Sequence, residues 1–121
     1  MSLKNKKILL IIGGGISAYK SLDLIRLLQR KGSSVKVVLT KSGKKFVTSL
    51  SVSSLSKNRV FEEMFDEKNK GKIDHISLSR WADIILTIPA TANFMSKLSK
   101  GSADDLASTI ILASNKEIFL A

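Results

Sequence analysis

The segment from Lys6 to Lys20 constrains the fold more than any other part of the chain. It joins an unbroken apolar run, Ile8–Ile12, to three glycines, Gly13–Gly15, and then to a helical pattern that starts near Ser17. Because the run does not alternate with polar residues, it predicts a strand buried on both faces, as in a parallel sheet. The glycines allow a sharp turn, and Ser17 is placed to cap the helix. Free N–H groups and the positive helix end would point the same way, which predicts an anion site.

The rest of the chain alternates between apolar strand-like runs and helical patterns. Strands are predicted over 8–12, 35–39, 84–88 and 117–121, and helices over 17–30, 44–57, 94–100 and 106–114. A brief extended piece is expected at Val60-Phe61, followed by a charged loop from Glu62 to Asp74. This alternation predicts an α/β fold, a doubly wound, Rossmann-like or flavodoxin-like parallel sheet with helices on both faces. We expect a single domain over residues 1–121.

Several side chains have expected roles within these elements. Phe46 and Leu50 are expected to point inward from the 44–57 segment, which is read as one or two short helices. Gly32 is expected to end the first helix, and either Asp104 or Asp105 to cap the last one.

Three loops are predicted to meet at one edge of the sheet: Gly13–Ser17, Thr40–Ser42 and Pro89–Asn93. Each follows a predicted strand, and ligands of doubly wound sheets bind at the carboxyl ends of strands where the winding reverses. The loops are rich in glycine, hydroxyl and amide groups, and none carries a carboxylate. This composition favours a mononucleotide phosphate with a polar ring, although Thr40–Ser42 taken alone fits an ordinary polar turn equally well.

Two features argue against NAD as the ligand. The first turn does not match G-x-G-x-x-G, because Ala18 stands where the last glycine would be. No acidic residue follows the second strand, where an acid usually holds the adenosine ribose.

The formal charge of +10 is distributed unevenly along the 121 residues. Residues 1–61 hold 13 lysines and arginines against one acid, whereas residues 62–121 hold seven against nine. A basic half can indicate nucleic acid, but the basic residues are scattered and few aromatics are available for base stacking. We therefore favour a solvated lysine-rich surface and expect no nucleic-acid partner.

Composition also limits the chemistry and the location. The absence of cysteine excludes disulfides, thiolate zinc sites and thiol chemistry supplied by this chain. No segment approaches the ~20 apolar residues of a membrane span, and no cleavage site follows the N-terminal lysines, so we expect a cytoplasmic protein.

His75 is the only histidine and the best acid–base candidate, although a lone histidine often has no chemical role. No cluster of ligands indicates a metal.

Five blocks, in this order, resemble the homo-oligomeric flavin-containing cysteine decarboxylases. The similarity is greatest to the phosphopantothenoylcysteine decarboxylases of coenzyme A biosynthesis. The blocks are Gly14–Lys20, Thr40–Ser42 before Phe46, His75–Leu78 leading to Arg80–Asp83, Pro89–Asn93 and Gly101–Leu106. Together they span nearly the whole chain from Lys6 onward.

The resemblance implies FMN as the cofactor. It implies that two loops bind the FMN phosphate and that a third loop lines the flavin. The residues implied at the phosphate are Gly15, Ile16, Ser17, Thr40, Lys41 and Ser42, and those implied at the flavin are Thr91, Ala92, Asn93 and Phe94. It assigns the family's essential histidine to His75. The implied reaction is FMN-dependent decarboxylation of 4'-phosphopantothenoylcysteine to 4'-phosphopantetheine. The implied assembly is a trimer or dodecamer with the flavin site at a subunit contact.

The family also has features that this sequence does not contain. A Pro-x-Met-Asn motif follows the strand that here ends at Ala121, and a clamp with a proton-donating cysteine comes later. We therefore expect the domain to be C-terminally incomplete, with FMN binding but impaired turnover. Three alternatives remain: a lantibiotic peptidyl-cysteine decarboxylase, a non-catalytic regulatory partner, and a basic nucleic-acid module.

Overall fold

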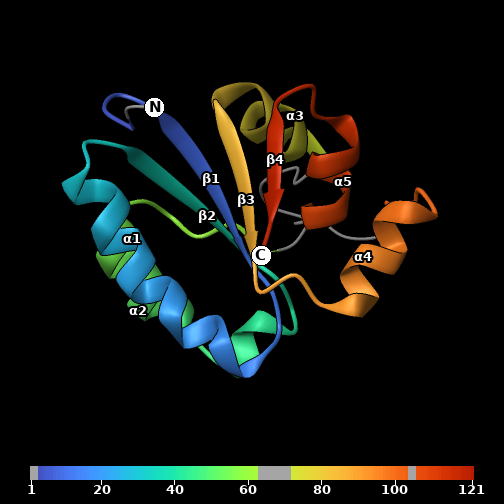
Figure 1. Ribbon diagram of the computed structural model, residues 1–121, viewed down its shortest axis with the longest axis horizontal. Helices are drawn as coiled ribbons and strands as arrows, with labels where there is room; N and C mark the ends of the chain where they lie inside the picture. The colour runs from blue at the N-terminus through green and yellow to red at the C-terminus, as the bar shows by residue number, and fades with distance from the viewer. Residues whose placement is uncertain (1–2, 63–71, 104–105) are drawn as a thin grey trace.

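The computed structural model describes residues 3–62, 72–103 and 106–121, and it leaves out the side chains of residues 72–75 and 93. Its described part contains one parallel sheet in the order β2-β1-β3-β4 (Figure 1). The strands are β1 (Lys7–Ile12), β2 (Ser34–Leu39), β3 (Ile84–Ile88) and β4 (Glu117–Leu120). This arrangement confirms the predicted doubly wound α/β fold.

The central strand β1 pairs along its length with β2 on one side and β3 on the other. Ile11, for example, lies opposite Val38 of β2 and Thr87 of β3. The expected extended piece near Val60 is reduced to one parallel bridge between Val38 and Phe61, at the outer edge of β2.

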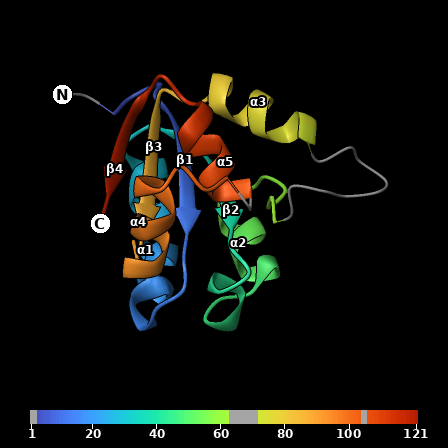
Figure 2. The same ribbon diagram turned by 90° about the vertical axis from the view of Figure 1, so that its right-hand side faces the viewer.

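Helices cover both faces of this sheet (Figures 1 and 2). The 3-10 turn η1 (Ile16–Tyr19) leads into α1 (Lys20–Arg30), and η2 (Gly43–Lys45) precedes α2 (Ser49–Ser56). Helices α1 and α2 lie on one face, while α3 (Lys72–Trp81) and α5 (Leu106–Ala113) lie on the other. Helix α4 (Ala92–Ser99) also packs on the α5 side, through Phe94 and Leu98.

The two hydrophobic layers follow from the alternation of side chains along β1. Ile8, Leu10 and Ile12 face α1 and α2, whereas Leu9 and Ile11 face α3 and α5. All five residues are buried, which confirms that the apolar run is a strand covered on both faces.

Several local expectations were wrong. Ser17 does not cap a helix, because the chain first makes the η1 turn from Gly15 and α1 begins only at Lys20, with no side-chain cap. Phe46 and Leu50 are exposed, at 47% and 76%. Leu50 lies two positions before the buried Val52, and residues two apart on a helix do not share a face.

The charged loop expected from Glu62 to Asp74 does not extend to Asp74, because helix α3 already begins at Lys72. Residues 63–71 of that segment lie outside the described part of the structure. Asp104 and Asp105, the candidate caps of the last helix, lie outside it as well. Gly32 does end α1, with a φ of 90° that favours glycine. None of the described helices is long and apolar enough to cross a membrane.

Candidate functional site

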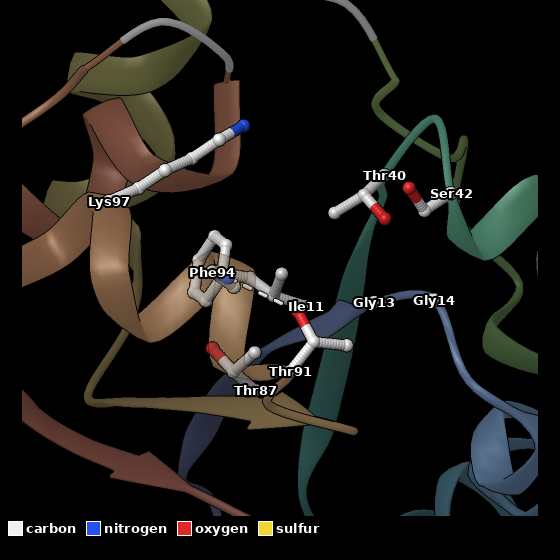
Figure 3. Close-up of a pocket in the computed structure, with 9 residues that line it drawn as sticks. All are labelled: Ile11, Gly13, Gly14, Thr40, Ser42, Thr87, Thr91, Phe94 and Lys97. Atoms are coloured by element: carbon white, nitrogen blue, oxygen red, sulfur yellow. Dashed lines mark hydrogen bonds between the residues drawn. The ribbon is translucent and has the colours of Figure 1, made fainter.

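A pocket opens where the winding of the sheet reverses, at the carboxyl ends of β1, β2 and β3. The chain leaves β1 toward β2 on one side, and β3 lies on the other side of β1. The described residues that line the pocket are Ile11, Gly13, Gly14, Thr40, Ser42, Thr87, Thr91, Phe94 and Lys97 (Figure 3). All three predicted loops therefore contribute to one pocket, as the sequence suggested.

Glycines allow these loops to approach one another closely. A Cβ on Gly13 would lie 2.6 Å from the Pro89 carbonyl oxygen, and a Cβ on Gly14 would lie 2.5 Å from the Ser42 Cβ. The Gly13 N–H donates a hydrogen bond of 3.2 Å to the Ile88 carbonyl, which ties the first turn to the end of β3. Glycine is needed here because of contact between loops, since any side chain would push them apart.

The first turn also presents unpaired backbone donors. Within the part of the chain that the structure describes, the N–H groups of Gly14, Gly15, Ile16 and Ser17 donate no hydrogen bond. They are consecutive and precede η1 and α1. Successive free N–H groups at such a turn form an anion-binding concavity.

Thr40 and Ser42 differ in the availability of their hydroxyl groups. The Thr40 hydroxyl donates to the Ile12 carbonyl at 3.1 Å and accepts from the Gly43 N–H at 3.0 Å. It therefore holds the second loop against β1 and has no proton left for a ligand. Ser42 also lines the pocket, and no hydroxyl bond ties it to another described residue. Lys41 is exposed and does not line the pocket.

The third loop places the start of α4 beside the pocket. Thr91 caps this helix, as predicted, because its hydroxyl oxygen accepts from the Phe94 N–H at 3.1 Å. Thr91 and Phe94 both line the pocket, and the Phe94 ring is buried. Ala92 is exposed and does not line it, and the side chain of Asn93 lies outside the described part.

Two polar lining residues were missed by the sequence analysis. Thr87 is the only polar residue within β3, and Lys97 follows Phe94 by three positions, so it lies on the same face of α4. Both signals were available in the sequence. The described lining residues include a lysine and no carboxylate, which favours an anionic ligand.

The family model for Flavoprotein matches residues 1–120. The chain belongs to the Flavoprotein family. This confirms the family resemblance that the five sequence blocks indicated.

Known proteins similar to this member of the Flavoprotein family include a curated relative and two solved structures. The Coenzyme A biosynthesis bifunctional protein CoaBC of Haemophilus influenzae is 46% identical over 121 residues, which cover 100% of this chain and 30% of that protein. A PPC decarboxylase mutant complexed with pantothenoylaminoethenethiol is 28% identical at a TM-score of 0.79, covering 98% of this chain and 66% of that one. The FMN binding protein AtHal3 is 27% identical at a TM-score of 0.79, with 98% and 65% covered. The chain thus spans about a third of the length of the curated relatives it matches.

The Arg80–Asp83 block of this Flavoprotein member has a structural role in the sheet. The Asp83 carboxylate accepts from the Lys7 N–H at 2.8 Å, and the Asp83 N–H donates to the Lys7 carbonyl at 2.7 Å. The Trp81 ring lies 4.6 Å from the Lys36 ammonium. These contacts fix the start of β3 against the start of β1, at the opposite end from the pocket.

His75 belongs to α3, and its side chain lies outside the described part of the structure. Helix α3 lies toward the amino ends of the strands, whereas the pocket opens at their carboxyl ends (Figures 1 and 2). Among the described residues, Gly15, Ile16 and Ser17 do not line the pocket. The catalytic role of His75 stays a prediction.

Proposed function

We propose that this chain binds FMN in the pocket at the carboxyl ends of β1, β2 and β3, and that it forms the flavin-binding part of a phosphopantothenoylcysteine decarboxylase. The observation that carries the proposal is the convergence of the three loops on one pocket, with free N–H groups on the turn that begins at Gly14 and no carboxylate among the described lining residues. Similarity to CoaBC and to the FMN binding protein AtHal3 supports the choice of flavin.

The chain's own groups suit the phosphate end of this cofactor. The N–H groups of Gly14–Ser17 would hold the phosphate oxygens, together with the Ser42 hydroxyl and the Lys97 ammonium. Thr91 and Phe94, with Ala92 and Asn93 beside them, would border the flavin ring. Gly15, Ile16 and Ser17 would act through their backbone, which does not require their side chains to line the pocket.

The proposed reaction converts 4'-phosphopantothenoylcysteine to 4'-phosphopantetheine with release of CO2, in the cytoplasm. Bound flavin supplies the reversible two-electron oxidation that decarboxylation next to a thiol carbon requires and that no side chain provides. In this proposal His75 positions or deprotonates the reacting end of the substrate.

The placement of α3 supports a homo-oligomer, a trimer or dodecamer, in which His75 serves the pocket of a neighbouring subunit. Helix α3 lies away from the pocket of its own chain, so a second copy would be needed to bring the imidazole to the flavin.

Titration of the purified chain with FMN tests the cofactor proposal. We expect quenching of flavin fluorescence with a stoichiometry of one per chain, and weaker binding of riboflavin, which lacks the phosphate. The nucleic-acid alternative would be favoured by two results together. The chain would leave FMN fluorescence unchanged at micromolar concentration, and it would bind a heparin column until modest salt eluted it.

The substrate class is tested on the FMN-loaded chain. We expect phosphopantothenoylcysteine to perturb the flavin spectrum at lower concentration than a peptide with a C-terminal cysteine. The reverse order would favour the lantibiotic-type alternative. No perturbation by either compound, with FMN still bound, would favour a non-catalytic partner.

A further inference from the structure

Thr87 places a buried hydroxyl without a partner in the middle of the sheet. The residue is 1% exposed, and its hydroxyl oxygen has no hydrogen-bond partner among the described residues. It pairs with Ile11 of β1 and with Leu120 of β4, so it is central in the sheet. The other residues of β3 are isoleucine and leucine.

An unpaired buried hydroxyl opposes folding, and valine would fill nearly the same volume without that penalty. Buried polar groups in native proteins normally have a partner, so an exception of this kind calls for an explanation. A ligand that is bound only part of the time is one such partner.

The pocket supplies the place where that partner would bind. Thr87 lines it on the same side as Thr91 and Phe94, while Thr40 and Ser42 lie on the opposite side (Figure 3). Rotation about χ1 exchanges the hydroxyl and methyl positions of a threonine, so the hydroxyl can turn toward a ligand without backbone movement.

We propose that the Thr87 hydroxyl is a ligand-binding group of this pocket and hydrogen-bonds a polar atom of the ligand on the side that Thr91 and Phe94 line. For FMN this atom belongs to the edge of the flavin ring or to a ribityl hydroxyl. The assignment rests on the proposed function. It makes Thr87 a residue that stabilises the complex while it destabilises the ligand-free protein.

The test compares the wild type with T87V and T87S, using thermal unfolding of the ligand-free protein and titration with FMN and riboflavin. T87V is expected to raise the ligand-free Tm by roughly 2–6 °C, because the orphaned hydroxyl is gone. The same variant is expected to bind FMN roughly 3- to 10-fold more weakly, which corresponds to the loss of one hydrogen bond. T87S keeps the hydroxyl and is expected to bind FMN within about twofold of the wild type.

The outcomes separate this assignment from the proposed function. Weaker binding of both FMN and riboflavin by T87V supports the assignment, because both compounds carry the flavin ring and the ribityl chain. Weaker binding of FMN alone overturns it, because the partner would then be the phosphate. If T87V binds FMN and riboflavin as tightly as the wild type does, the assignment is overturned and the proposed function stays intact. A wild-type chain that binds no flavin overturns both.

Discussion

Gly14 and Ser42 lie in contact across two loops that are 28 positions apart in the chain. A Cβ on Gly14 would lie 2.5 Å from the Ser42 Cβ, closer than real Cβ contacts occur. A Cβ on Gly43 would likewise lie 2.5 Å from the Ile12 carbonyl oxygen. The turns after β1 and β2 therefore interlock, and this interlock sets the width of the pocket between them.

Gly14→Ala is predicted to lower both stability and FMN affinity, because the added methyl group forces the two loops apart. We expect a loss of FMN affinity of at least about tenfold, together with a lower Tm. Gly101→Ala is the control: Gly101 has a φ of 70°, no atom within 4 Å of its Cβ position and no place in the pocket lining, so the methyl group adds only backbone strain. Titration and thermal unfolding of both variants check the prediction. If the Gly14→Ala variant binds FMN with wild-type affinity, the interlock does not control the pocket.

Thr91→Ala is predicted to destabilise the protein by about 1 kcal/mol, because it removes the cap of α4. FMN binding should weaken as well, since this helix end borders the pocket. Thr48→Ala is a matched control, because the Thr48 hydroxyl caps α2 through the Ser51 N–H at 3.0 Å and lies outside the pocket lining. Chemical denaturation should give similar losses for both variants, with FMN affinity reduced only in the first. Equal FMN affinities would show that the α4 terminus does not act on the ligand.

Ser42→Ala and Thr40→Val should affect different properties. Ser42 is exposed and its hydroxyl bonds no other described residue, so its removal should leave the ligand-free Tm unchanged and weaken FMN about 3- to 10-fold. Thr40→Val leaves the Gly43 N–H without its partner and should cost about 1–3 kcal/mol of stability. Riboflavin titration of the serine variant distinguishes phosphate contact from other effects. A riboflavin affinity that falls as much as the FMN affinity would refute a phosphate contact.

Asp83→Ala is predicted to destabilise the sheet without changing FMN affinity. The variant loses the bond from the Lys7 N–H at the end of the strands opposite the pocket, at an expected cost of about 1–2 kcal/mol. Asp83→Asn keeps an acceptor oxygen and should cost less. Because Trp81 is the only tryptophan and lies two residues away, its fluorescence reports the unfolding directly. Loss of FMN binding in a folded Asp83→Ala protein would argue against a purely structural role for this block.

The sheet was predictable because its strands are unbroken apolar runs between turn residues. The runs 8–12, 35–39 and 84–88 lie within β1, β2 and β3, which begin at most one residue earlier. Thr91 and Gly32 were also predicted correctly, since a helix cap depends on the neighbouring residues alone. The capping role of Ser17 was wrong because the chain makes the η1 turn after Gly15, and α1 begins only at Lys20.

The strands, their parallel direction and the three loops that meet could be predicted from the sequence, because hydrophobic runs and turn residues act locally. Tertiary structure alone decided which groups remain available to a ligand. The Thr40 hydroxyl is engaged by Ile12 and Gly43, whereas the Thr87 hydroxyl is left without a described partner at the pocket. Whether a hydroxyl is free depends on the donors and acceptors that distant segments bring to it, and those are fixed only when the chain packs.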